Sequence, residues 1–236
     1  KYISEKVYMN LKFYPNRFII MSERDGYNHL YAYNFNGSLI KKITQGNMVV
    51  NDFYGYDEGT GSYYYSANMA DDPIHTDVYC TDKNGKTIKL SSEKGQNSAI
   101  FSKNMKYYMN VYSNINTPFV TALCNNKGKT LKVLEDNAAL KQKLANISLG
   151  SREFFSFTTG EGIKLHGYMV KPANVEPQNK YPVILFQYSG PGSQQVIDSW
   201  GAGNMGGTLY EQYLTQKGFI AVCVDGRGTG GRGADF

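Results

Sequence analysis

The 236-residue sequence has little cysteine, histidine or tryptophan, and it has no long apolar run. Its three cysteines lie far apart, so they form neither a metal-ligand spacing nor a disulfide framework, and they leave the redox compartment open. The longest apolar runs, Val183–Phe186 and Phe219–Val224, fall far short of the roughly 18 residues that cross a bilayer. No membrane span is therefore predicted. The chain opens without Met and without a signal peptide, which indicates a processed or engineered start.

Charge of one sign is not in large excess either. The sequence has 25 Lys and Arg against 20 Asp and Glu, a net charge of +5, and the basic residues are scattered. Such a balance requires neither nucleic acid nor a membrane as a partner. The hydrophobic content of 41% is enough for a sizeable core and excludes wholesale disorder. The length predicts one or two domains.

Tyrosine is abundant and unevenly placed, because 15 of the 20 lie at or before Tyr112. That part alternates aromatic and polar residues in short runs, which is typical of strands joined by tight turns. Three turns recur, at Asn36-Gly37, Asn84-Gly85 and Lys127-Gly128, and their glycines are 48 and 43 residues apart. A period of this length predicts about three β-propeller blades. A β-sandwich with three similar hairpins is the alternative.

After a predicted short helix at 137–144, the pattern changes. Two strands are predicted at 153–158 and 164–171, on either side of a glycine turn. Residues 182–188 then form a continuously apolar run, the kind of strand that is buried on both faces of a parallel sheet.

Together with this strand, the next two segments predict a βαβ unit. Residues 208–217 predict an amphipathic helix, and residues 219–224 predict a second buried strand. The helix places three apolar residues on one face: Leu209, Tyr213 and Leu214. The second half therefore reads as the beginning of an α/β domain.

The two apolar strands need cover that one helix cannot give. Leaving about ten apolar side chains half-covered forfeits on the order of 10 kcal/mol. A whole domain is stable by only about 5–15 kcal/mol. We therefore expect the chain to be part of a longer protein, with propeller blades at 1–136, a linker with a short helix at 137–152 and a truncated α/β domain at 153–236.

Two glycine clusters, at 201–206 and 228–233, fit the G-x-G-x-x-G pattern of dinucleotide binding. The first follows a long loop, and Asp225-Gly-Arg227 separates the second from its strand, so nucleotide binding is only a minor alternative. The three histidines are isolated, and no serine lies in a G-x-S-x-G nucleophile elbow. The sequence predicts no metal and no cofactor.

Tyr188 is the best candidate for a functional residue. It lies at the carboxyl end of the apolar strand, where open α/β sheets bind ligands, and a Gly-Pro-Gly turn follows it. A phenol there can donate a hydrogen bond to a developing oxyanion. In α/β-hydrolases the loop after the third strand supplies such a donor, and this strand is the third counted from Glu153. The alternative is a tyrosine that caps the core with its hydroxyl in solvent.

Several motifs together resemble the dipeptidyl peptidase IV family of serine peptidases, in the prolyl oligopeptidase clan. They are Gln-Tyr-Ser-Gly-Pro-Gly-Ser-Gln at 187–194, then Trp200, then Asp-Gly-Arg-Gly-Thr-Gly at 225–230. Ser-Glu-Arg-Asp-Gly-Tyr-Asn-His-Leu-Tyr at 22–31 and Tyr-Ser-Asn-Ile-Asn-Thr-Pro at 112–118 resemble the last propeller blades of that family. The resemblance covers nearly the whole chain in order.

The resemblance implies a mixed β and α/β chain: a partial β-propeller of about three blades, followed by the first strands of an α/β-hydrolase domain. It implies a serine exopeptidase that releases X-Pro or X-Ala dipeptides from peptides with a free N-terminus through an acyl-enzyme. Tyr188 takes the role of oxyanion-hole donor. The catalytic Ser, Asp and His are expected after Phe236, and the acidic pair that grips the substrate amine is expected before Lys1. The chain alone is therefore predicted to be inactive.

Two other functions stay open. One is an oligopeptidase or acylaminoacyl peptidase of the same clan, and the other is a non-catalytic propeller binding module with a hydrolase remnant. The resemblance also allows a homodimer of the full-length protein. Because bacterial members of the family are usually exported, it implies a periplasmic or cell-surface location.

Overall fold

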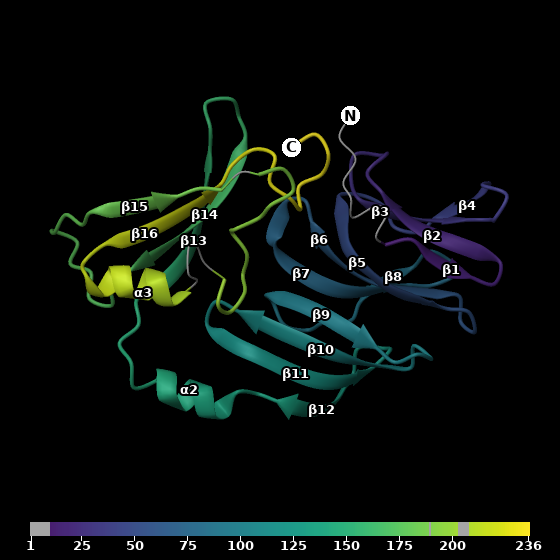
Figure 1. The fold of residues 1–236 in the computed structure, drawn as a ribbon, viewed down its shortest axis with the longest axis horizontal. Coiled ribbons are helices and arrows are strands. Elements are labelled where there is room, and N and C mark those ends of the chain that lie inside the picture. The colour runs from purple at the N-terminus through teal and green to yellow at the C-terminus, as the bar shows by residue number, and fades with distance from the viewer. Residues whose placement is uncertain (1–9, 189, 203–207) are drawn as a thin grey trace. The chain divides into compact units, whose positions relative to one another are not determined.

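The structure is a computed structural model that describes residues 10–188, 190–202 and 208–236. It divides into two compact units (Figure 1). Unit 1 comprises Lys1–Tyr112, Val120–Glu135 and Gly231–Phe236, and unit 2 comprises Ser113–Phe119 and Asp136–Gly230. No helix in the described part of the chain is long and apolar enough to cross a membrane.

Unit 1 is built from β-strands that follow one another in groups of four. The first group forms a separate sheet with the order β1-β2-β3-β4. The second and third groups form one sheet with the order β12-β11-β10-β9-β7-β6-β5, in which β8 pairs with β7. A single parallel residue pair, Thr76 with Gln96, joins the two groups.

The bounds of these strands are as follows: β1 Lys12–Tyr14, β2 Arg17–Ser22, β3 His29–Tyr33, β4 Leu39–Lys42, β5 Met48–Asp57, β6 Ser62–Met69, β7 Asp72–Thr81, β8 Thr87–Lys89, β9 Gln96–Phe101, β10 Tyr107–Asn114, β11 Thr117–Asn125 and β12 Thr130–Glu135. The chain is mostly β-sheet with few helices, which is the composition of a β-propeller-like region.

The three recurring turns of the sequence are confirmed, and each joins the last two strands of its group. Gly37, Gly85 and Gly128 have φ values of +84°, +89° and +85°, a region that side chains other than glycine rarely enter. The amide of each glycine donates a hydrogen bond to the carbonyl oxygen three residues earlier, at 3.0 Å. The repeated Gly therefore meets the same backbone requirement in every group.

Two apolar clusters hold the strand groups together. The first joins the first two groups and includes Tyr63 and Tyr65, and the second joins the last two groups and includes Tyr64. Successive residues of a strand point to opposite faces of the sheet. Strand β6 is therefore buried on both sides, and its tyrosines contribute to both clusters.

The buried His29 predicts a pH dependence of the stability of unit 1. Its side chain lies within hydrogen-bond distance of Thr44 (2.9 Å between Nδ1 and Oγ1), and burial, aided by the Lys42 charge, lowers the pKa of His29 to about 4. An unfolded histidine titrates near pH 6.5, so between these values the unfolded state binds more protons. We expect the free energy of unfolding to fall by about 2–3 kcal/mol as the pH drops from about 6.5 to about 4, at about 1.4 kcal/mol per pKa unit.

Urea unfolding at several pH values, followed by near-ultraviolet circular dichroism of the tyrosines, measures this dependence. A His29→Gln variant should lose most of it. An equal pH dependence in the variant and the parent would contradict the assignment to His29.

Unit 2 contains a four-stranded sheet with the order β13-β14-β16-β15. Its elements are α2 Ala138–Leu144, β13 Ser151–Thr158, β14 Lys164–Lys171, β15 Val183–Phe186, α3 Thr208–Gln216 and β16 Ile220–Asp225. Strands β15 and β16 are parallel, whereas β13 and β14 form an antiparallel hairpin and β14 is antiparallel to β16. The predicted strand–helix–strand order, with parallel strands, is confirmed.

Strand β15 is not buried on both faces among the described residues, because Val183 and Leu185 are 59% and 65% exposed. Such incomplete cover is what the sequence predicts for a chain with one crossover helix. The expected inner face of α3 was wrong. In α3, Leu209 and Tyr213 are exposed, and the buried residues are Glu211, Gln212, Leu214 and Thr215. The helix turns this mainly polar face inward because Glu211 and Gln212 have partners beneath it.

Candidate active-site loop

Tyr188 lies two residues after β15, on a loop that leaves the sheet beside a second glycine-rich loop. Strands β15 and β16 are parallel neighbours, with Phe186 opposite Cys223, so the loops that follow them start at the same edge of the sheet. Ligand sites of open α/β sheets lie at this edge. The position of Tyr188 after the strand therefore agrees with the sequence-based expectation.

The Tyr188 side chain is 55% exposed. Its ring lies against the backbone of Gly190, where a Cβ atom would be 3.1 Å from Cε1, Cζ and Oη of the tyrosine. Among the residues that the structure describes, none hydrogen-bonds the Tyr188 hydroxyl. The phenol is thus supported on one side and free to donate a hydrogen bond on the other.

Asp225, the last residue of β16, holds the far end of the same loop. Its carboxylate is buried and accepts hydrogen bonds from the backbone N–H groups of Gln195 (3.0 Å) and Val196 (2.9 Å). Burial raises the pKa of Asp225, and the two amide hydrogen bonds oppose this rise only in part. The sequence marked Asp225 as part of a motif but gave no sign of these partners, which lie about 30 residues away.

The glycine-rich loop after β16 is hydrogen-bonded to the Tyr188 loop through the backbone. The Gly192 amide donates to the Gly228 carbonyl oxygen (3.1 Å), and the Gly230 amide donates to the Ser193 carbonyl oxygen (2.8 Å). Residues 226–236 form turns, and no helix opens on the last glycine of the 228–233 pattern. The Gly230 amide is already occupied, so this segment lacks the phosphate cradle of a dinucleotide site. In the other pattern, residues 203–206 lie outside the described residues.

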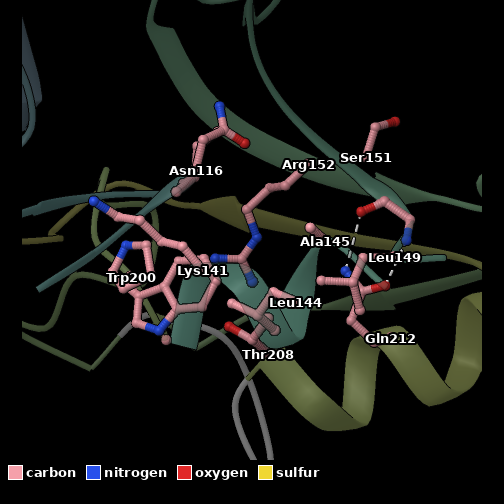
Figure 2. Close-up of a pocket in the computed structure, with 14 residues that line it drawn as sticks. Asn116, Lys141, Leu144, Ala145, Leu149, Ser151, Arg152, Trp200, Thr208 and Gln212 are labelled. Atoms are coloured by element: carbon pink, nitrogen blue, oxygen red, sulfur yellow. Dashed lines mark hydrogen bonds between the residues drawn. The ribbon is translucent and has the colours of Figure 1, made fainter. Parts of the chain in front are cut away.

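A pocket of about 590 Å³ lies elsewhere in unit 2 (Figure 2). Its walls come from the β10–β11 turn, helix α2, the start of β13 and the segment around Trp200. None of the described residues among 187–196 lines it. The lining residues are Ile115, Asn116, Pro118, Lys141, Leu144, Ala145, Leu149, Gly150, Ser151, Arg152, Trp200, Gly201, Thr208 and Gln212.

Two polar side chains on the pocket wall, those of Arg152 and Gln212, already have partners within the protein. Arg152 is hydrogen-bonded to Glu211 and to the Ala202 carbonyl oxygen. The side-chain amide of Gln212 accepts from the Gly150 amide (2.6 Å) and donates to the Gly150 carbonyl oxygen (3.1 Å), as Figure 2 shows. These interactions hold the linker, the sheet and α3 together. The Arg152 and Gln212 side chains are therefore already engaged within the protein.

Two of the three histidines, His29 and His75, give no second candidate site. His29 is buried against Thr44, and His75 pairs with Asp72 at 2.7 Å. Across the described ranges there is no cluster of three or more His, Cys, Asp or Glu side chains that could hold a metal ion. The expectations of no metal and no cofactor stay predictions.

The chain therefore consists of repeated four-stranded groups, followed by a mixed sheet that contains a strand–helix–strand unit. Residues 2–119, half of the chain, match the family described as "Dipeptidyl peptidase IV (DPP IV) N-terminal region". The chain belongs to the dipeptidyl peptidase IV family.

Similar proteins carry related names. The crystal structure of Porphyromonas gingivalis dipeptidyl peptidase 4 is 40% identical, with a TM-score of 0.90, and the match covers 97% of this chain and 32% of that one. Dipeptidyl aminopeptidase B of Saccharomyces cerevisiae is 30% identical over 242 residues, covering 89% of this chain and 28% of its own. Dipeptidyl peptidase 4 of Arthroderma otae is 28% identical over 226 residues, covering 93% and 28%. The chain thus spans less than a third of the length of these relatives.

Proposed function

We propose that the chain is part of a serine exopeptidase that releases N-terminal X-Pro or X-Ala dipeptides, with Tyr188 as an oxyanion donor. Membership of the dipeptidyl peptidase IV family supports the peptidase activity. One observation supports the role of Tyr188: its exposed phenol follows the parallel strand β15, on a loop that is hydrogen-bonded to the neighbouring strand β16. Peptides with a free N-terminus are the proposed substrates.

In this proposal a serine hydroxyl gives its proton to histidine and attacks the peptide carbonyl carbon. The carbon–nitrogen bond then breaks, the leaving amine takes the proton from histidine, and an acyl-enzyme forms. Water then hydrolyses the acyl-enzyme. The negative charge that develops on the carbonyl oxygen accepts a hydrogen bond from the Tyr188 hydroxyl. A donor placed before the reaction begins needs no reorganisation in the transition state, which is why such donors accelerate acyl transfer.

The proposal places the catalytic Ser outside these 236 residues, because the sequence contains no G-x-S-x-G motif. It places the catalytic Asp and His outside them as well, as the family resemblance implies. It assigns 1–136 to propeller blades, 137–152 to a linker and 153–236 to the first part of an α/β-hydrolase domain. The same proposal includes a periplasmic or cell-surface location and a homodimer of the full-length protein, which cell fractionation and light scattering would test.

Hydrolysis of a Gly-Pro chromogenic amide tests the proposed activity. We expect the full-length protein to cleave this substrate, and to lose nearly all turnover when the substrate amine is acetylated, because an exopeptidase must bind the free ammonium group. We expect the 236-residue chain alone to cleave neither substrate.

Each other result favours a different function. Efficient cleavage of the acetylated substrate by the full-length protein would replace the dipeptidyl assignment with an oligopeptidase or acylaminoacyl peptidase. Absence of cleavage of both substrates would favour the non-catalytic binding module. Turnover by the 236-residue chain alone would overturn the placement of the triad.

A further inference from the structure

The loop that carries Tyr188 has no regular secondary structure, yet a phenol that stabilises an oxyanion must be held in place before the reaction. Gly190 and Gly192 give this loop backbone freedom, and Gly192 has a φ of +72°. Such a segment needs outside contacts to stay in one conformation. The contacts come from β16 and from the loop that follows it.

Asp225 supplies the strongest of these contacts. It is 6% exposed, and its two carboxylate oxygens accept from the N–H groups of Gln195 and Val196. No Lys or Arg side chain of the described residues pairs with this carboxylate. Hydrogen bonds to an ionised group are shorter and stronger than neutral ones, so the loop is bound to the end of β16 by charge-assisted bonds.

The backbone extends this anchor toward Tyr188. Ser193 donates from its N–H (2.9 Å) and from its hydroxyl (2.6 Å) to the carbonyl oxygen of Gly190, which closes a tight turn. The Gly230 amide donates to the Ser193 carbonyl oxygen. Gly190 is the residue against which the Tyr188 ring lies. A continuous path of hydrogen bonds and contacts therefore leads from β16 to the phenol.

We infer that Asp225 is a positioning residue for the Tyr188 hydroxyl: it acts through the loop and does not touch the substrate. This inference rests on the proposed oxyanion role of Tyr188. An Asp225→Asn substitution keeps the size of the side chain but replaces one acceptor oxygen with an NH₂ group, which faces an N–H donor and cannot accept from it. The loop would then move, and the donor would move with it.

A double-mutant cycle in the full-length protein tests the inference, with kcat and KM measured on the Gly-Pro chromogenic amide. We expect Asp225→Asn to lower kcat by about 10-fold to 100-fold, the scale of a misplaced catalytic group, and to change KM little. In a Tyr188→Phe background the same substitution should lower kcat less than about 3-fold, because the donor that it displaces is already gone.

Thr229→Val is the matched control. Thr229 is buried in the same loop, but its hydroxyl donates to Gly226 and not to residues 190–196. This variant should lower kcat by a similar small factor in both backgrounds. If Asp225→Asn does not fold, Gly230→Ala takes its place, because a Cβ on Gly230 would lie 2.7 Å from the Gly192 carbonyl oxygen and push the same loop.

The outcomes separate this inference from the proposed function. Equal losses of kcat from Asp225→Asn in both backgrounds would overturn the positioning role and leave the oxyanion donor standing. A lowered melting temperature with unchanged kcat would also overturn it, because Asp225 would then be purely structural. If Tyr188→Phe alone left kcat unchanged, Tyr188 would not be the oxyanion donor of the proposed function. The positioning role of Asp225 would then fail as well.

Discussion

Replacing Tyr188 with Phe in the full-length protein is expected to lower kcat by about 10²–10³-fold, the usual loss for one oxyanion-hole donor. The substitution removes a single oxygen atom and leaves the ring against Gly190. Because the oxyanion exists only in the transition state and the tetrahedral intermediate, KM should change little. The side chain is 55% exposed, so the melting temperature should stay the same. Steady-state kinetics with the Gly-Pro chromogenic amide measures both constants.

Tyr213→Phe is the control for this variant. Tyr213 lies on α3 in the same unit, and its exposed fraction of 54% is nearly equal to that of Tyr188. Its kcat should match that of the parent. Unchanged turnover of the full-length Tyr188→Phe enzyme would contradict the oxyanion role. Tyr188 would then be a tyrosine that caps the core with its hydroxyl in solvent.

Removing the Glu211 carboxylate is expected to destabilise unit 2 by about 3–5 kcal/mol, because it leaves the buried charge of Arg152 without its partner. The exposed fractions of the Arg152 and Glu211 side chains are only 7% and 4%. Tyr168 donates its hydroxyl to Glu211, and the Arg152 guanidinium lies 4.3 Å from the centre of the Tyr168 ring. Burial, together with the Glu211 carboxylate, raises the pKa of Tyr168, so this phenol stays a proton donor.

Urea unfolding of the Glu211→Ala chain measures this loss, with the fluorescence of Trp200 as the signal. Trp200 is the single tryptophan of the sequence and belongs to unit 2. The exposed pair of Lys171 and Glu153, 2.7 Å apart, provides the control, and Glu153→Ala should cost less than about 1 kcal/mol. If both variants lost the same free energy of unfolding, the buried pair of Arg152 and Glu211 would contribute no more to stability than the exposed pair.

The local features of this fold could be predicted from the sequence, whereas its non-local ones could not. The turns at Gly37, Gly85 and Gly128 were predictable because a positive φ selects glycine wherever it occurs. The order of β15, α3 and β16 followed from two apolar runs and from the helical spacing of apolar residues between them. These signals lie within a few residues of the features that they indicate.

Burial depended on partners that no local pattern reveals. The apolar run of β15 indicated a strand buried on both faces, but the described residues leave Val183 and Leu185 exposed. Leu209 and Tyr213 suggested the inner face of α3, but Arg152 and Gly150 bind the opposite, polar face. The contact of Asp225 with Gln195 and Val196 was hidden for the same reason. The role of Tyr188 stays a prediction.

Strand β6 has a consequence for how unit 1 unfolds. Tyr63 and Tyr65 belong to one apolar cluster and Tyr64 to the other, so displacing these tyrosines opens one core or the other. In repeat-like architectures such shared interfaces transmit stability between nearest neighbours. Detachment of the first sheet would expose one face of β6 to solvent. The less stable strand would then weaken the next interface, so we expect the strand groups to unfold one after another.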